Sequence, residues 1–158
     1  MSVRGTVILG IGNPLMSDDG VGIHAVRDIL ANPSRTPGAR CLDGGTLGYL
    51  LVGHIKQVDD LIVIDAAQLG DRPGTVCVFE NEEMDAFLGS HPNRSVHEVG
   101  LGDLMTMSAL SGHLPKRRAL IAVQPMDTDW GTELSPPLME SLPVVCEKAA
   151  ELMEKWRS

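Results

Sequence analysis

The sequence predicts an α/β fold with one mostly parallel, twisted sheet of about five strands and helices on both of its faces. Short apolar runs alternate along the chain with longer segments whose apolar residues recur every three or four positions. This alternation is typical of helices that pack on a parallel sheet. One run, residues 61–64 (LIVI), is apolar throughout, as expected of a strand that is buried on both faces.

The predicted elements follow one another in a simple order. A first strand at 6–11 is followed by a helix at 20–31, with Ile23, Val26 and Leu30 on its inward stripe. The later elements are a strand at 40–42, a helix at 46–58, strands at 61–64 and 75–79, a short acidic helix at 82–88, a helix at 100–110, a strand at 119–123 and a helix at 138–156.

Three of these elements carry further expectations. The strand at 75–79 follows its predecessor after a short turn, so we expect it to be the one antiparallel strand. In the C-terminal helix, Pro143 predicts a bend because proline cannot donate a backbone hydrogen bond. The helix at 100–110 has four apolar residues on its expected inward face: Leu101, Leu104, Met105 and Ala109.

Composition restricts the classes of function. The length of 158 residues suits one domain, and the formal charge of −8 argues against nucleic acid and anionic membranes as partners. No segment approaches the roughly 18 consecutive apolar residues of a membrane span, and no signal peptide is recognisable. The cysteines at 41, 77 and 146 form no CxxC pair and suit free thiols in the cytoplasm. We expect a cytoplasmic monomer whose partner has a basic contact face.

Polar and acidic residues follow the predicted strands where each strand ends. Asp18 and Asp19 come after the first strand, residues 43–46 (DGGT) after the second, and Asp65 after the third. His97 lies just before a predicted helix. Because open α/β sheets bind ligands beyond the carboxyl ends of their strands, we expect these residues to gather at one edge.

Asp19, Asp65 and His97 together offer two carboxylates and one imidazole. Such a set can bind a first-row divalent ion such as zinc, nickel or manganese and leave positions open for water or substrate. The competing interpretation of Asp18 and Asp19 is helix capping, and we expect one of the two to serve only as a cap.

A nucleotide-binding interpretation competes for the first loop. Gly10 and Gly12 after a strand resemble a dinucleotide fingerprint, and Asp43 could take the place of a ribose-binding carboxylate. However, Leu15 stands where the third glycine is required. Carboxylates at the helix N-terminus would also repel a pyrophosphate, so we regard a Rossmann-like nucleotide-binding domain as the weaker alternative.

Four segments resemble the motifs of the nickel–iron hydrogenase maturation proteases. They occur in the family's order and spacing across nearly the whole chain, at residues 10–22 (GIGNPLMSDDGVG), 43–46 (DGGT), 61–66 (LIVIDA) and 97–104 (HEVGLGDL). The resemblance implies that residues 1–158 form a single domain of this family. It also implies a hydrolase, namely an endopeptidase that removes the C-terminal extension of the nickel-loaded precursor of a hydrogenase large subunit.

By motif position, the family's metal-contacting and catalytic residues correspond to Asp19, Asp65 and His97. The resemblance implies that the nickel they contact is supplied by the precursor, although zinc or cadmium can occupy the same donors. Relatives often carry glutamate at the position of Asp19, so the metal position or the helix start must shift here by about a bond length.

The motif after the second strand suggests residues that orient the substrate. We assign this role to Asp18, Asp43, Gly44, Gly45 and Thr46, because glycine allows a substrate to approach the backbone closely. A nickel-sensing maturation chaperone that uses the same three ligands without cleavage is the alternative function.

Overall fold

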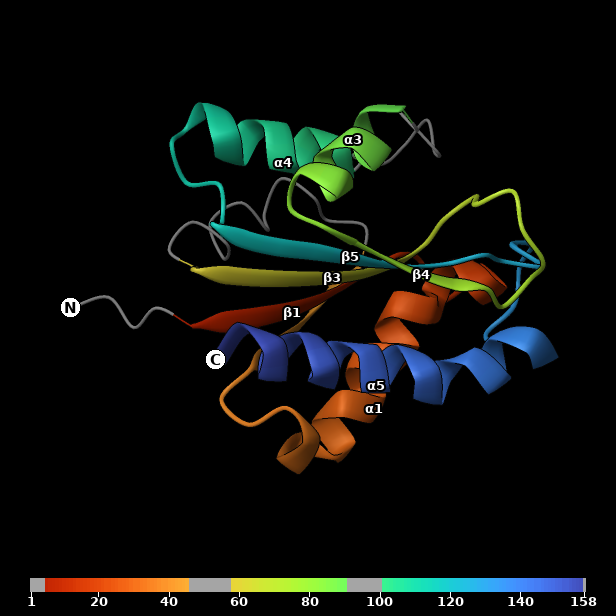
Figure 1. Cartoon of the computed structure of the whole chain (residues 1–158). Helices are drawn as coiled ribbons and strands as arrows, with labels where there is room; N and C mark the ends of the chain where they lie inside the picture. The colour runs from red at the N-terminus through yellow and green to blue at the C-terminus, as the bar shows by residue number, and fades with distance from the viewer. Residues whose placement is uncertain (1–4, 46–57, 91–100, 158) are drawn as a thin grey trace.

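The computed structural model describes residues 5–45, 58–90 and 101–157, except for the side chain of Leu104. One five-stranded sheet runs through its centre in the order β2-β1-β3-β5-β4 (Figure 1). The strands are β1 (Thr6–Ile11), β2 (Arg40–Gly45), β3 (Asp60–Ala66), β4 (Val76–Glu80) and β5 (Arg117–Val123). All pairings are parallel except that of β4 with β5, which confirms the predicted fold class and the predicted antiparallel strand.

Helices lie on both faces of the sheet, with α1 and α5 on one face and α3 and α4 on the other (Figure 1). The helices are α1 (Val21–Ala31), α3 (Glu82–Ser90), α4 (Leu101–Leu110) and α5 (Pro136–Arg157), with short 3₁₀ turns η1 (Ser17–Gly20) and η2 (Pro33–Arg35). The helix predicted at 46–58 lies outside the described residues, apart from its last position. Among the described helices, none has both the length and the apolar character that a membrane span requires.

The two faces of the sheet bury different side chains of the same strands. In β1, Ile8 packs with α1 and α5, whereas Val7 and Leu9 pack with α3 and α4. This alternation follows from the two-residue period of a strand. It explains why the central strands are apolar throughout, since both of their faces are buried.

Two helices turn slightly different faces to the core than predicted. In α1, Leu30 is 55% exposed and Ile29 is buried instead. In α4, Ala109 is exposed whereas Ser108 is buried. Leu30 and Ala109 each follow the residue that is buried. One position corresponds to a rotation of about 100° around a helix, which is enough to turn a side chain from the core to the surface.

Two further elements differ in extent from the prediction. β2 continues through Asp43 to Gly45, so the second motif ends a strand and does not follow one. α5 is continuous from Pro136 to Arg157, and Pro143 lies on its exposed side. The predicted bend at Pro143 stays a prediction.

Ion pairs anchor the amino-terminal edge of the sheet, opposite the predicted site. Arg117 Nε and Nη2 donate to the two carboxylate oxygens of Asp60 at 2.7 and 2.9 Å, and the guanidinium lies over the ring of Trp156. Arg118 Nε donates to Asp85 Oδ1 at 3.0 Å. Since these contacts join β3, β5, α3 and α5, the amino edge stabilises the fold, and the carboxyl edge carries the predicted site residues.

Candidate functional site

The loop after β1 holds Asp19 in a fixed position. Asn13 N donates a hydrogen bond of 2.9 Å to Asp19 Oδ2. Gly12 has a φ of +128°, and a Cβ atom on it would lie 1.9 Å from the carbonyl oxygen of Asp19. Only glycine fits this close approach, so the backbone around Asp19 folds directly onto the end of β1.

Asp65 lies at the same edge, as the penultimate residue of β3, and is partly buried. The start of α1 rests on this strand end, because a Cβ on Gly22 would lie 2.2 Å from the carbonyl oxygen of Ile64. Gly22 comes three residues after Asp19, and Ile64 directly precedes Asp65. The structure therefore places Asp19 and Asp65 beside neighbouring strand ends, as the sequence predicts.

Helix packing explains the Gly10-x-Gly12 pattern without a nucleotide. A Cβ on Gly10 would lie 2.3 Å from the carbonyl oxygen of Gly22. Both glycines of the pattern are thus required by the close approach of η1 and α1 to β1.

Replacing Gly12 with alanine is expected to destabilise the fold by about 2 kcal/mol, because the new Cβ would force the backbone of Asp19 away from β1. Gly38 offers a matched control. It also has a positive φ, +84°, but a Cβ there would meet nothing within 4 Å. Gly38→Ala should therefore lower the free energy of unfolding only by the strain of a left-handed backbone, about 1 kcal/mol. Urea denaturation of both variants measures the difference, and equal losses would contradict the packing role of Gly12.

Asp18 has a different role from its neighbour. Its side chain is fully buried. It accepts hydrogen bonds from Met126 N and Asp127 N at 2.9 Å and from Ser135 N and Oγ at 2.7 Å. Burial alone would raise the pKa of Asp18, but the hydrogen bonds from these residues outweigh it and hold the pKa below its ordinary value.

The predicted capping role of one of the two aspartates is wrong. The residue before η1 is Met16 and the residue before α1 is Gly20, and neither helix start receives a side-chain cap. The carboxylate of Asp18 faces the loop after β5, and that of Asp19 faces the loop after β1. The helix start is held by the glycine contacts instead of by a cap.

The loop after β5 is a part of the site region that sequence reasoning missed. Gly131 N donates to the carbonyl oxygen of Leu15, and Ser17 N donates to that of Gly131, each at 2.9 Å. Ser17 Oγ donates to the carbonyl oxygen of Asp129 at 2.8 Å. The position of this loop in the sequence could have revealed it. A loop that follows a parallel strand must lie at the carboxyl edge of the sheet, where the site is expected.

The second motif supports the end of β1. Gly12 N donates to the carbonyl oxygen of Gly45 at 3.1 Å, and Gly45 has a φ of +51°. Asp43 Oδ2 lies 3.9 Å from Arg27 Nη2 of α1, and about half or more of each side chain is exposed. Gly44 is buried, and Thr46 lies outside the described residues. The role of these residues and of Asp18 in orienting a substrate stays a prediction.

His97 also lies outside the described residues. Within the parts of the chain that the structure describes, no three side chains of His, Cys, Asp or Glu gather as a metal site would require. The structure therefore presents the two carboxylates of the predicted set, and the complete three-ligand set stays a prediction.

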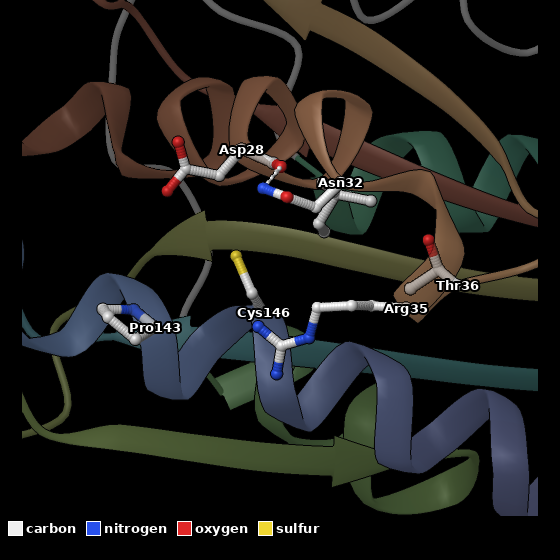
Figure 2. A pocket seen from close by; sticks show the side chains of 7 residues that line it. Asp28, Asn32, Arg35, Thr36, Pro143 and Cys146 are labelled. Carbon is white, nitrogen blue, oxygen red and sulfur yellow. Dashed lines mark hydrogen bonds between the residues drawn. The ribbon is translucent and has the colours of Figure 1, made fainter.

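A separate pocket lies between α1, η2 and α5, on the face of the sheet that α1 and α5 cover (Figure 2). The Cys146 thiol and the Arg35 guanidinium lie close together in it, and Asn32 and Asp28 of the α1 end also line it. Burial raises the pKa of the Cys146 thiol, and the nearby carboxylate of Asp28 adds to this effect. Arg35 acts in the opposite direction but does not outweigh them, and a raised pKa leaves less of the nucleophilic thiolate form.

Solved structures define the class of this fold as an endopeptidase fold. The hydrogenase maturating endopeptidase HybD from Escherichia coli superposes with a TM-score of 0.83 at 28% identity, over 97% of this chain and 94% of that one. The maturation protease HybD from Thermococcus kodakarensis gives a TM-score of 0.75 at 31% identity, over 99% of this chain and all of that one.

Sequence comparisons agree with the structural ones. The family model described as "Hydrogenase maturation protease" matches residues 23–152. The HupD protein of Rhizobium leguminosarum is 36% identical over 95% of this chain and 74% of its own length. The hydrogenase 2 maturation protease of Escherichia coli is 30% identical over 82% of this chain and 79% of its own length. The chain belongs to the hydrogenase maturation protease family and is a peptidase, as the four motifs predict.

Proposed function

We propose that this peptidase removes a C-terminal extension from the precursor of a hydrogenase large subunit, and that nickel already bound by the precursor marks the bond to be cut. The observation that carries the proposal is the pair of carboxylates, Asp19 and Asp65, beside neighbouring strand ends in a chain of this family. The names of the relatives support hydrogenase maturation as the process.

The donors suit the nickel of the precursor. Asp19 Oδ2 is held by Asn13 N, while its second oxygen accepts no hydrogen bond from the described part of the chain and can face a ligand. Carboxylate and imidazole groups are acceptable nickel ligands, so Asp19, Asp65 and His97 would contact the metal of the substrate. Zinc or cadmium could occupy the same donors in the absence of substrate.

Hydrolysis then requires a base and a water molecule at the scissile peptide. In our proposal one of the two carboxylates takes a proton from the water, whose oxygen adds to the peptide carbonyl carbon. The peptide C–N bond breaks, the proton passes to the leaving amine, and a new C-terminal carboxylate remains on the large subunit. Asp43, Gly44, Gly45 and Thr46 would orient the substrate segment at this edge of the sheet.

The setting of the reaction follows from the cysteines and the charge. Cys41, Cys77 and Cys146 are all free thiols, which suits a reducing cytoplasm. We propose that the protein acts there as a monomer. Its net charge of −8 disfavours self-association and favours a partner with a basic contact face.

The intact mass of a nickel-loaded large-subunit precursor, incubated with this protein, tests the proposed function. We expect one cut, seen as the loss of a single C-terminal peptide and the appearance of one new C-terminus. A nickel-sensing chaperone would bind the same precursor and leave its mass unchanged. An unchanged mass with folded protein and loaded precursor would therefore overturn cleavage in favour of binding alone.

A further inference from the structure

Three large apolar side chains are exposed beside the site, on the two loops that hydrogen bonds join. Trp130 is 80% exposed, Met126 is 61% exposed and Leu15 is 53% exposed. We call these three residues the apolar rim. Large apolar side chains that cluster on a surface mark contacts with a partner more often than isolated ones do.

Hydrogen bonds donated by the backbone of the loop after β5 hold the apolar rim in place. The residue after Trp130 donates to the carbonyl oxygen of Leu15 at 2.9 Å. Met126 N donates to the buried carboxylate of Asp18 at 2.9 Å. Asp19 follows directly in the chain, so the rim and the candidate catalytic carboxylate belong to one cross-linked unit. A partner that binds a preorganised surface loses less conformational entropy in ordering it.

The surroundings of the apolar rim are acidic. Asp127, Asp129 and Glu133 are exposed on the same loop. Between Ala119 and Glu147 the sequence contains no lysine or arginine. This surface therefore complements a segment that presents both an apolar side chain and a basic one.

We propose that the apolar rim binds a segment of the precursor next to the scissile bond, with an apolar side chain packed on Trp130 and a lysine or arginine facing the carboxylates. This inference rests on the proposed function, and the continuity of the rim with Asp19 selects the substrate as the occupant. A second copy of this chain is the weaker choice, because two such acidic loops would repel each other.

Steady-state cleavage of the nickel-loaded precursor by Trp130→Ala tests this role. We expect KM to rise about 10- to 100-fold, as for a tryptophan at the centre of an interface, with kcat within about 2-fold of the wild type. Trp130→Phe should recover most of the loss. Leu110→Ala is the matched control, because Leu110 is 83% exposed at the end of α4, a helix that covers one face of the sheet. An unchanged KM in Trp130→Ala, or an equal rise in Leu110→Ala, would overturn the inference.

A binding measurement separates this inference from the proposed function. The dissociation constant of the loaded precursor is measured for Asp65→Ala and for Asp65→Ala combined with Trp130→Ala, neither of which needs to cleave. We expect the second protein to bind about 10- to 100-fold more weakly. If the wild type leaves the precursor intact but this difference is found, the proposed cleavage fails and the binding surface stands. If the wild type cleaves and both proteins bind equally, only the binding surface fails.

Discussion

Asp65→Ala is expected to lower kcat/KM for cleavage of the nickel-loaded precursor by about 1000-fold or more, the loss that removal of a central catalytic group produces. Asp65 is the penultimate residue of β3 and is only partly buried, so most of the core packing of that strand lies in residues 61–64. The fold should therefore survive the substitution. The loss would come from the missing metal contact or base, whichever role the carboxylate serves.

Asp43→Asn is the control for charge at the same edge of the sheet. Its carboxylate is largely exposed and lies 3.9 Å from Arg27, so the pair contributes little to stability. We expect a loss of less than about 10-fold in kcat/KM, consistent with a role in orienting substrate. Circular dichroism shows whether both variants are folded. A folded Asp65→Ala that processes the precursor at the wild-type rate would refute the three-ligand site.

Asp18→Ala is expected to destabilise the protein by about 3 to 4 kcal/mol, the largest loss of stability that we predict. The substitution removes the acceptor for three backbone N–H groups and one hydroxyl, all of which come from the loop after β5. These partly buried donors would lose an acceptor that is itself fully buried. Urea denaturation measures the loss, and Asp129→Ala, which alters an exposed side chain on the same loop, should change stability by less than about 0.5 kcal/mol.

The same carboxylate makes stability depend on pH. The pKa of Asp18 is lowered in the folded state, so the folded protein keeps the charged form at pH values where the unfolded chain, with a pKa of about 3.9, is already protonated. Its contribution is present above the unfolded pKa and is lost as pH falls through the folded pKa. The stability difference between the wild type and Asp18→Asn should therefore shrink below about pH 4. A difference that stays constant down to pH 2 would contradict the charged, hydrogen-bonded state.

Much of the sheet could be predicted from local sequence. β1 and β3 are short apolar runs that end at glycine or aspartate, and their residues pack on both faces. The position of Asp65 follows from the same pattern, since a carboxylate after a buried strand must lie at the sheet edge. The inward face of α1 was predicted correctly at Ile23 and Val26 but wrongly at Leu30, because apolar residues also lie beside the stripe and the structure buries Ile29 instead.

The partners of Asp18 could not be predicted from the sequence. They lie 108 to 117 positions away, in a loop with no periodic pattern. Two adjacent aspartates before a helix look alike in sequence, and only the tertiary contacts distinguish the buried anchor from the candidate ligand. For the same reason the apolar rim appears only when the two loops are seen to be joined.

The rate of C-terminal mass loss, measured in parallel on nickel-loaded and nickel-free precursor, shows whether substrate nickel marks the bond to be cut. If Asp19, Asp65 and His97 contact the metal of the substrate, this protein should cut the loaded precursor and leave the nickel-free precursor intact. Adding nickel to the nickel-free precursor under conditions that load it should then restore cleavage. Equal rates on the two precursors would contradict the claim that substrate nickel marks the bond to be cut.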